Sequence, residues 1–194
     1  MGSNMSNLFF TSDNHFFHQN ICKYAGRPFS SVEDMNEALI KNWNQAVQPN
    51  DEVWNLGDFS FGNYNQTTQV LKRLNGKHNF VMGNHDKIII KNKEDLLKSG
   101  LFQSIQDYKH LKFNNQNIIL FHFACRVWDK SHHGSWHLWG HSHNSLPPYG
   151  KSFDVGVDST VVTKEYRPIS FDEVKQYMDK VEIKVVDHHD GMRD

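Results

Sequence analysis

The sequence contains few cysteines and no long apolar stretch. Only 2 of its 194 residues are cysteines, Cys22 and Cys125, which excludes a small secreted domain held together by disulfides. No segment approaches the roughly 18 consecutive apolar residues that a membrane-spanning helix needs. The N-terminus also lacks a basic stretch followed by an apolar run, the mark of a signal peptide. We therefore expect a reducing, cytoplasmic compartment and no membrane partner.

An excess of charge of either sign is also lacking. The chain has 21 Lys and Arg against 22 Asp and Glu, for a net charge of -1, so we expect no broad basic surface for long nucleic acid. A short nucleotide bound through metal ions is compatible with this balance. Hydrophobic residues make up 38% and aromatic residues 13%, enough to build a packed core in a chain of this length. Histidine is abundant, with 13 copies, and is the commonest metal ligand.

The chain is predicted to fold as one α/β unit. We expect residues 1–6 to be a cloning remnant with a flexible N-terminus, 7–187 to form a single domain, and 188–194 to be a flexible tail. Short apolar runs alternate with amphipathic segments, which is typical of layered α/β domains. Helices are predicted over 32–47, 66–74, 94–98 and 171–178, the first capped by Ser30 or Ser31 and the last by Ser170. Strands are predicted over 7–11, 52–56, 79–82, 105–113, 118–121, 137–139, 153–157 and 181–186.

Polar side chains directly follow five of the predicted strands. They are, in chain order, Asp13 and His15, then Asp58, then Asn84, His85 and Asp86, then His122, then His141 and His143. In layered α/β folds, ligands bind beyond the carboxyl ends of the strands. Gly57, Gly83 and Gly140 precede three of these groups and permit tight turns in which the backbone passes close to a ligand. The pattern predicts a site built from residues far apart in the sequence.

The donor types at these strand ends indicate a transition-metal site. Carboxylates, an amide and several imidazoles suit Mn, Fe, Zn or Ni. No thiolate favours a structural zinc site, and ligation by oxygen alone, as for Ca or Mg, is a poor match. The spacings Asp13-x-His15 and His141-x-His143 predict pairs of side chains on the same side of an extended backbone. Because the donors span 13–143 and converge only in the fold, we expect an open, catalytic site.

The ordered series resembles the signature of the calcineurin-like metallophosphoesterases. The motifs that carry the resemblance cover about residues 8–143 and are Asp13-x-His15, Gly57-Asp58, Gly83-Asn84-His85-Asp86, His122 and Gly140-His141-x-His143. The stretch 13–29 is similar to a subgroup of small bacterial and phage phosphoesterases. The resemblance implies a four-layer αββα sandwich with mixed β-sheets and a binuclear metal centre.

The resemblance also implies how the ligands divide between two divalent ions. One ion would take Asp13, His15 and His143, the other would take Asn84, His122 and His141, and Asp58 would bridge them. Mn is the ion expected first, with Fe, Zn or Ni as alternatives. A hydroxide held between the two ions would attack the phosphorus near neutral pH.

The implied activity is hydrolysis of a phosphoester. His85 would protonate the leaving oxygen, and we expect Asp86 to orient His85. A small domain with no obvious cap favours an open groove, and hence a phosphodiester of a small nucleotide-like substrate. A phosphomonoester is the alternative. A non-catalytic scaffold is a second alternative, which the presence of His85 disfavours. A nuclease acting on longer chains is a third, and would need a local basic patch at Lys87, Lys91 and Lys93.

The sequence departs from many relatives after the second strand. They carry Gly-Asp-x-x-Asp-Arg, whereas Gly57-Asp58 is followed here by Phe-Ser-Phe-Gly, which disfavours phosphoprotein phosphatase activity. A phosphate-binding arginine must therefore come from elsewhere. Arg27 and Arg126 are candidates because a planar guanidinium can clamp a phosphate, with a surface or structural salt bridge as the alternative. His18 is a third candidate for substrate binding, with a hydrogen bond to a ligand as the alternative.

A second histidine-rich segment, 131–135, is predicted to be a loop near the mouth of the site. It contains His132 and His133, whose roles the sequence leaves open. Trp128 and Trp136 flank this loop and could stack on a base or sugar, although core packing is the favoured interpretation. His137 is expected to be packed within its strand. The sequence carries no indication of the oligomeric state.

Overall fold

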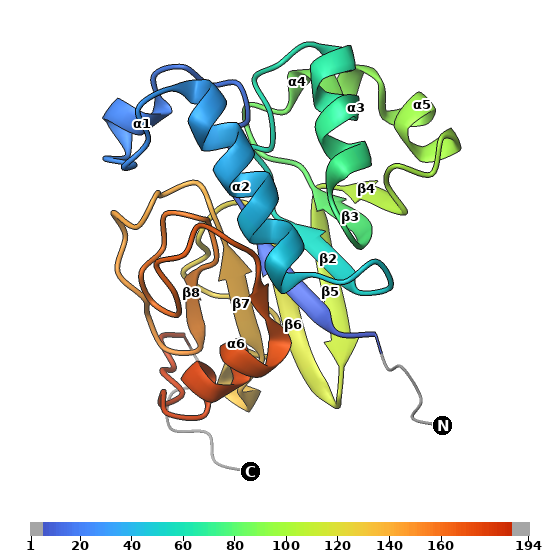
Figure 1. The fold of residues 1–194 in the computed structure, drawn as a ribbon. Helices are drawn as coiled ribbons and strands as arrows, with labels where there is room; N and C mark the ends of the chain where they lie inside the picture. The colour runs from blue at the N-terminus through green and yellow to red at the C-terminus, as the bar shows by residue number, and fades with distance from the viewer. Residues whose placement is uncertain (1–5, 188–194) are drawn as a thin grey trace, which may run out of the picture.

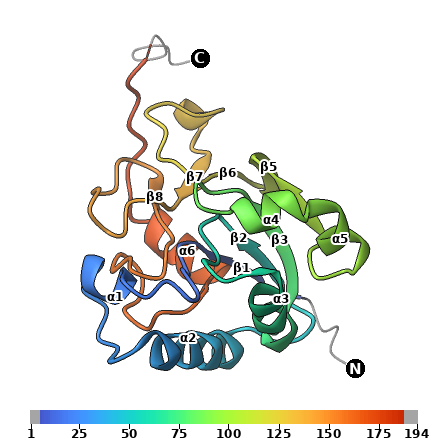
Figure 2. The same cartoon turned by 90° about the horizontal axis from the view of Figure 1, so that it is seen from above.

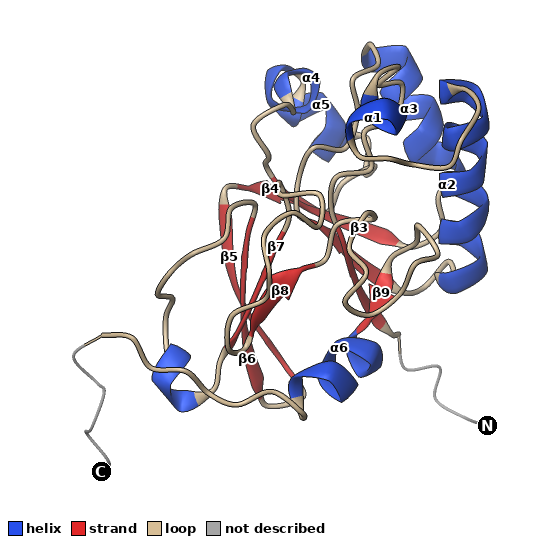
Figure 3. Ribbon diagram, turned by 90° about the vertical axis from the view of Figure 1, so that its left-hand side faces the viewer, coloured by secondary structure: helices blue, strands red, loops and turns tan. Residues whose placement is uncertain are grey.

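Two mixed β-sheets pack against each other at the centre of the molecule (Figure 1, Figure 3). The computed structural model describes residues 6–187. The predictions for 1–5 and for the tail 188–194 lie outside the described residues. The mixed α/β architecture with two sheets agrees with the predicted fold class.

The first sheet brings the first three predicted strands side by side. Its order is β4 (Ser104–Gln106), β3 (Lys77–Val81), β2 (Glu52–Asn55), β1 (Leu8–Thr11) and β9 (Ile169–Ser170). β1 to β4 are parallel, and β9 joins β1 antiparallel. Because parallel strands share one carboxyl edge, the polar residues that follow β1, β2 and β3 meet there.

The second sheet has the order β5 (Tyr108–Phe113), β6 (Gln116–Phe121), β7 (Trp136–Trp139) and β8 (Ser152–Asp154). β6, β7 and β8 are parallel, and β5 pairs with β6 as a hairpin through the turn at Asn114 and Asn115. The predicted single strand over 105–113 is wrong. The chain leaves the first sheet after Gln106 and enters the second at Tyr108, so the weak alternation conceals two strands in different sheets.

The described residues form six α-helices and one 3-10 turn, and three of the α-helices begin at a side-chain cap. They are α1 (Ile21–Tyr24), α2 (Val32–Ala46), α3 (Tyr64–Arg73), α4 (Lys87–Lys91), α5 (Lys93–Lys98), the 3-10 turn η1 (Ser131–His133) and α6 (Phe171–Met178). Ser31 caps α2 by accepting from the Asp34 amide at 3.0 Å, as predicted. Asn63 and Gln66 form a capping box on α3. α1 and α4 were not predicted, because four or five residues carry too little periodicity.

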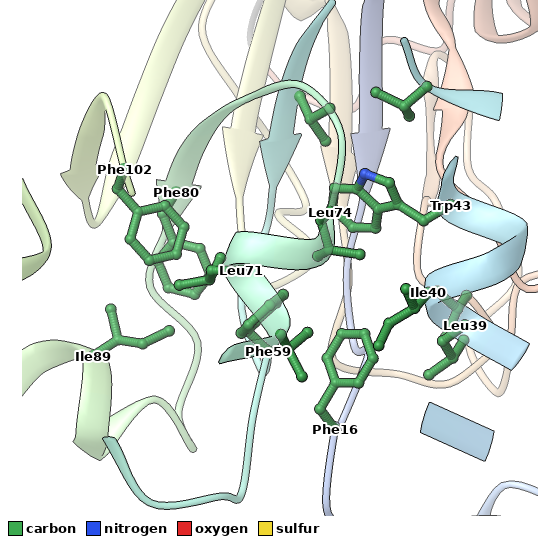
Figure 4. Close-up of a cluster of buried hydrophobic side chains, with 14 of the residues drawn as sticks. Phe16, Leu39, Ile40, Trp43, Phe59, Leu71, Leu74, Phe80, Ile89 and Phe102 are labelled. Atoms are coloured by element: carbon green, nitrogen blue, oxygen red, sulfur yellow. The ribbon is translucent and has the colours of Figure 1, made fainter. Parts of the chain in front are cut away.

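Two hydrophobic clusters hold these layers together. The first lies between the first sheet and the helices, where Trp43, Phe59 and Phe80 are buried (Figure 4). α2 and α3 lie side by side on this face (Figure 1, Figure 2), linked by Arg73 and Glu37 at 2.7 Å. The second cluster lies between the two sheets, and α6 packs into it through residues such as Phe171 and Val174.

The predicted closing strand over 181–186 is wrong. The described chain is irregular there, and Ile183 and Val186 remain 46% and 36% exposed. The edge beside β1 is taken instead by Ile169–Ser170. An alternating apolar pattern predicts an extended backbone. A strand also needs a neighbouring strand with a free edge, and the sequence pattern does not show whether one exists. Within the described residues, no helix has both the length and the apolar character to cross a membrane. Cys22 and Cys125 are both free thiols.

Ser170 caps α6, as predicted, and a charged brace that was not predicted supports the same helix start. Glu173 accepts from the Ser170 amide at 2.8 Å and from Arg167 Nη2 at 2.7 Å. Burial by itself raises the pKa of Glu173, but Arg167 and Ser170 outweigh it and lower this pKa to about 2. A depressed carboxyl pKa stabilises the fold above the ordinary value of about 4.5, and the contribution is lost as pH falls through about 2.

The Glu173→Gln variant tests this brace. We expect a loss of about 1 kcal/mol in the free energy of unfolding at pH 7, since a charge-assisted pair becomes neutral. Urea unfolding at pH 7, 4 and 3 should show the difference from wild type narrowing as pH falls. A difference that is constant with pH would mean that the carboxylate charge contributes nothing to folding.

Candidate metal centre

The predicted ligands converge in two groups at the carboxyl ends of the strands. One group is Asp13, His15 and His143, and the other is Asp58, His122 and His141; the ligand atoms of each group lie within 4.8 Å of one another. Asn84 joins the second group, where its Oδ1 lies 3.0 Å from His122 Nε2 and 2.9 Å from His141 Nδ1. Bonds of roughly 2.0–2.2 Å to one cation at right angles put neighbouring ligand atoms about 3 Å apart.

Asp58 lies between the two groups. Its Oδ2 is 3.7 Å from His15 Nε2 and 3.5 Å from His122 Nε2. Its other oxygen, Oδ1, accepts a hydrogen bond from the His85 amide at 2.8 Å, which fixes the carboxylate plane. A carboxylate in this position can touch cations held by either group.

Buried polar atoms without a partner mark the first group. Among the described residues, three buried side-chain atoms make no hydrogen bond, and two of them are Asp13 Oδ1 and His15 Nε2. Leaving such atoms desolvated and unpaired costs roughly 1–3 kcal/mol each, and more for a charged one. A cation coordinated by both atoms would offset that cost. The donor set therefore fits a divalent metal ion.

Hydrogen bonds on the far ring nitrogens orient three of the imidazoles. His122 Nδ1 lies 2.6 Å from the Leu56 carbonyl, and His143 Nδ1 lies 2.7 Å from Asp158 Oδ2. His15 Nδ1 lies 3.0 Å from His18 Nδ1. With Nδ1 engaged in this way, Nε2 of each ring is left to face a metal, which is the usual arrangement around ligating histidines.

The backbone of the ligands differs from the prediction. Positive φ angles occur at most of them, namely Asp13 (56°), His15 (53°), Asp58 (54°), His141 (69°) and His143 (45°). The prediction of extended Asp-x-His and His-x-His pairs is therefore wrong. The left-handed region is disfavoured for residues with a Cβ and clusters at functional sites. The side chains converge because tight turns after the strands aim them inward.

The glycines before the ligands are required by close approach, as predicted. Gly57 has φ of 103°, and a Cβ there would lie 2.5 Å from the Gly83 nitrogen. A Cβ at Gly140 would collide with Ser12 and lie 2.5 Å from Asp13 Oδ2. A side chain at either position would displace the turn that presents a ligand.

Asp86 holds the ligand turns together. Its buried carboxylate accepts from three backbone amides, those of Asp58 at 2.7 Å, Phe59 at 3.0 Å and Gly83 at 2.7 Å. The expectation that Asp86 orients the His85 ring is thus corrected, since both of its oxygens are bound to the backbone. Its burial raises its pKa to about 6. Asp86 ties the end of β2 to the end of β3.

Arg27 is a structural residue, which corrects the prediction that it clamps phosphate. Its side chain is fully buried, and all five N–H donors are engaged. Nε and Nη2 donate to Asp158 at 2.7 and 2.8 Å, Nη2 also donates to the Asp13 carbonyl at 2.6 Å, and Nη1 donates to the Asn14 carbonyl at 2.9 Å and contacts the Met35 sulfur. Arg27 therefore braces the turn that carries Asp13.

Two acidic residues of the site escaped the sequence reasoning. Asp158 joins Arg27 to His143, and no motif marks it. Asp154 ends β8 and accepts from the amides of Gly156 and Asn144 at 2.7 and 3.2 Å. The predicted strand over 153–157 placed Asp154 inside a strand rather than at its end, so the strand-end rule did not mark it. Burial and the nearby Asp13 raise its pKa to about 7.

The other predicted residues lie in three different settings. His18 contacts the ligand His15, in agreement with the alternative of a hydrogen bond to a ligand. The exposed Arg126 lies 4.7 Å over the Tyr149 ring. His85 is exposed, with its ring centre 6.1 Å from that of His15.

The histidine-rich segment 131–135 lies away from the site, so the prediction that it borders the mouth is wrong. The Gly134 carbonyl accepts from Gln116 at 3.1 Å, and Gln116 begins β6, whereas the ligand His122 follows its end. Because β6 and β7 are parallel, the chain between them must run back from the carboxyl end of β6 to the edge of the sheet where β7 begins. Residues 131–135 lie at that edge, opposite the predicted ligands. Trp136 is buried against Phe171, which agrees with core packing.

A proton and a metal compete at His122. Burial by itself lowers the pKa of this imidazole, but Asp58 and Asp13 outweigh burial and raise the pKa to about 8. Burial likewise raises the pKa of Asp58, and His122 outweighs it, so that this pKa falls below its ordinary value. A bound divalent ion would take the place of the proton between these two residues.

The chain is similar in sequence and in fold to several known proteins. No family model matches the chain. The uncharacterized protein MJ1445 of Methanocaldococcus jannaschii is 32% identical over 91% of this chain and 93% of its own length. The protein of unknown function AQ665 from Aquifex aeolicus superposes with a TM-score of 0.66 at 25% identity, over 89% of this chain and 99% of that structure. A novel archaeal phosphodiesterase superposes with a TM-score of 0.50 at 16% identity, over 79% and 84% of the two chains, a likeness of fold alone.

Replacing Arg27 by Lys tests its structural role. A lysine cannot reproduce the planar fork, and Asp158 would be left partly unpaired in a buried position. We expect the free energy of unfolding to fall by about 3 kcal/mol or more and metal affinity to weaken. Arg126→Lys, at an exposed position, is the matched control and should change stability by no more than about 0.5 kcal/mol. Unchanged stability of Arg27→Lys with a raised KM would return Arg27 to a substrate role.

Proposed function

The chain belongs to the family of MJ1445, and we propose that it is a binuclear metal-dependent phosphohydrolase of the calcineurin-like metallophosphoesterase superfamily. The proposed substrate is a phosphodiester of a small nucleotide-like compound. The observation that carries the proposal is the Asp58 carboxylate, whose Oδ2 faces one imidazole of each ligand group at 3.7 and 3.5 Å. A shared anionic ligand of this kind is what two closely spaced cations require.

The ligand groups provide two cation sites with different donors. Asp13, His15 and His143 would hold one ion, and Asn84, His122 and His141 the other, with Asp58 shared. When bound, two divalent ions supply a nucleophilic water near neutral pH and offset the charge that develops on the phosphoryl oxygens. Mn is proposed first, and Fe, Zn or Ni fit the same nitrogen and oxygen donors.

His85 is the proposed proton donor to the leaving oxygen. It follows the ligand Asn84, and its amide holds Asp58 while its ring stays exposed beside the first ligand group. The ring is therefore anchored through its backbone and free to reach a bound substrate. An alkoxide leaves more readily when an imidazole can give it a proton in the transition state.

The charge of the site favours a diester over a monoester. Asp13 and Asp58 contribute two negative charges, so two divalent ions and one hydroxide leave a net charge of about +1. A phosphodiester carries one negative charge and a monoester close to two at neutral pH. Arg27, which would favour the second charge, is fully engaged elsewhere. A phosphomonoesterase remains the alternative, and the non-catalytic scaffold is disfavoured because His85 and every ligand are present.

The first test is hydrolysis of bis-p-nitrophenyl phosphate and p-nitrophenyl phosphate by Mn-loaded protein. We expect metal-dependent turnover with preference for the diester. Asp58→Asn should lose turnover together with bound metal. His85→Ala should keep its metal and lose about 10²- to 10⁴-fold in kcat, the usual contribution of a positioned acid.

Metal analysis of each variant is the control for this test. Turnover unaffected by chelation, or an unimpaired Asp58→Asn, would contradict the binuclear mechanism. Faster hydrolysis of p-nitrophenyl phosphate would show that the substrate class is a phosphomonoester and not a phosphodiester. No turnover of either ester by protein that holds two ions would favour the scaffold.

A further inference from the structure

Two exposed phenyl rings lie directly against the ligand histidines. Phe61 is 40% exposed and Phe123 is 39% exposed, although each is a large apolar side chain. Phe61 contacts the first ligand group and Phe123 the second. Exposed apolar surface beside a predicted catalytic centre is a feature that binding commonly explains.

Phe61 stacks on imidazoles with one face. Its ring centre is 5.0 Å from that of His15 and 4.0 Å from that of His18, with interplanar angles of 20° and 14°. The two imidazole centres are only 5.2 Å apart, too close for the rings to lie on opposite faces of Phe61. The two imidazoles therefore lie on the same side of Phe61, and the ring stays 40% exposed beside them. His85 lies at the same ring, with 5.0 Å between centres and a tilt of 40°.

Phe123 presents its ring to the second ligand group edge to face. Its centre lies 4.9 Å from that of His122, at 79°, and 4.7 Å from that of His141, at 61°. It directly follows a metal ligand in the sequence, so its position is tied to the site. Each half of the centre thus carries one aromatic ring.

We propose that Phe61 and Phe123 are stacking platforms for two nucleobases, one on each side of the scissile phosphate, and that the substrate class is a linear dinucleotide or an oligonucleotide end. This inference rests on the proposed function. Phe61 shares its neighbourhood with His85, the proposed proton donor, and therefore receives the base of the leaving nucleoside. Phe123 receives the base of the nucleotide that keeps the phosphate.

The exposed phenyl rings of Phe61 and Phe123 favour planar aromatic groups of a substrate over alkyl or sugar groups. A phenyl face offers dispersion and offset stacking to any base without selecting its sequence. Phe61 and its neighbour Gly62 carry no charge, so this segment offers a substrate an apolar ring and no cation for a second phosphate charge. A near-neutral chain that engages only the bases next to one phosphate needs no long basic groove.

The test compares three dinucleotides that differ only in their bases. One carries thymine on both sugars, one lacks the base on the leaving sugar, and one lacks the base on the retained sugar. Product analysis identifies which sugar leaves. Because the leaving alkoxide is the same in all three, ratios of kcat/KM isolate the bases. The enzymes are Mn-loaded wild type, Phe61→Leu and Phe123→Leu, with Tyr108→Leu as control; Tyr108 is 46% exposed and contacts Phe121.

We expect removal of either base to lower kcat/KM of the wild type about tenfold. Phe61→Leu should abolish the effect of the leaving-side base only, and Phe123→Leu that of the retained-side base only. Tyr108→Leu should keep both. These ratios are unaffected by a general loss of activity or of metal in a variant.

The outcomes separate this inference from the proposed function. Two outcomes would overturn the stacking sites and leave the proposed phosphodiesterase activity intact. In both, bis-p-nitrophenyl phosphate is hydrolysed; in the first, removing a base changes kcat/KM less than twofold, and in the second, no dinucleotide is hydrolysed. If no ester is hydrolysed, calorimetric titration of Mn-loaded wild type and variants with the same three dinucleotides decides. The stacking platforms would be supported if loss of each base weakens binding to the wild type and if the matching variant removes that difference. Equal binding of all three dinucleotides to the wild type would overturn the platforms.

Discussion

The desolvated acidic oxygen of Asp13 and the unpaired Nε2 of His15 are the constraint on which the rest of this structure depends. Neither atom makes a hydrogen bond; they lie 3.9 Å from each other at the carboxyl ends of the strands. Such atoms are tolerated only if something outside the polypeptide compensates them. A cation at these donors would supply that compensation, and with Asp58 between the two groups we propose a pair of divalent cations for all seven donors together.

The fold supports this arrangement with residues that never need to touch a substrate. Arg27 and Asp158 brace the turn of Asp13 and the ring of His143, while Asp86 binds the turns after β2 and β3. These bonds hold several ligands in the left-handed backbone region, at a cost of order 1–3 kcal/mol per residue. Buried hydrogen bonds to charged groups are strong enough to maintain that strain.

Sequence reasoning could predict which polar residues converge because their position follows from topology. Parallel strands bring their carboxyl ends together, so a polar residue after each strand is informative without any coordinates. The roles of Arg27 and Asp86 could not be found in the same way, because a residue type does not reveal its hydrogen-bond partners. Residues 131–135 were misplaced because the crossover to a parallel strand carries them to the opposite edge. The exposure of Phe61 depends on how His15 and His18 cover one of its faces, which no local pattern encodes.

The central claim is that Asp58 joins two cation sites. Anomalous diffraction from a crystal of the Mn-loaded protein tests it most directly. We predict two Mn peaks, one at Asp13, His15 and His143 and the other at Asn84, His122 and His141, both in contact with the Asp58 carboxylate. A single peak, or two peaks of which one lies away from Asp58, would contradict the account.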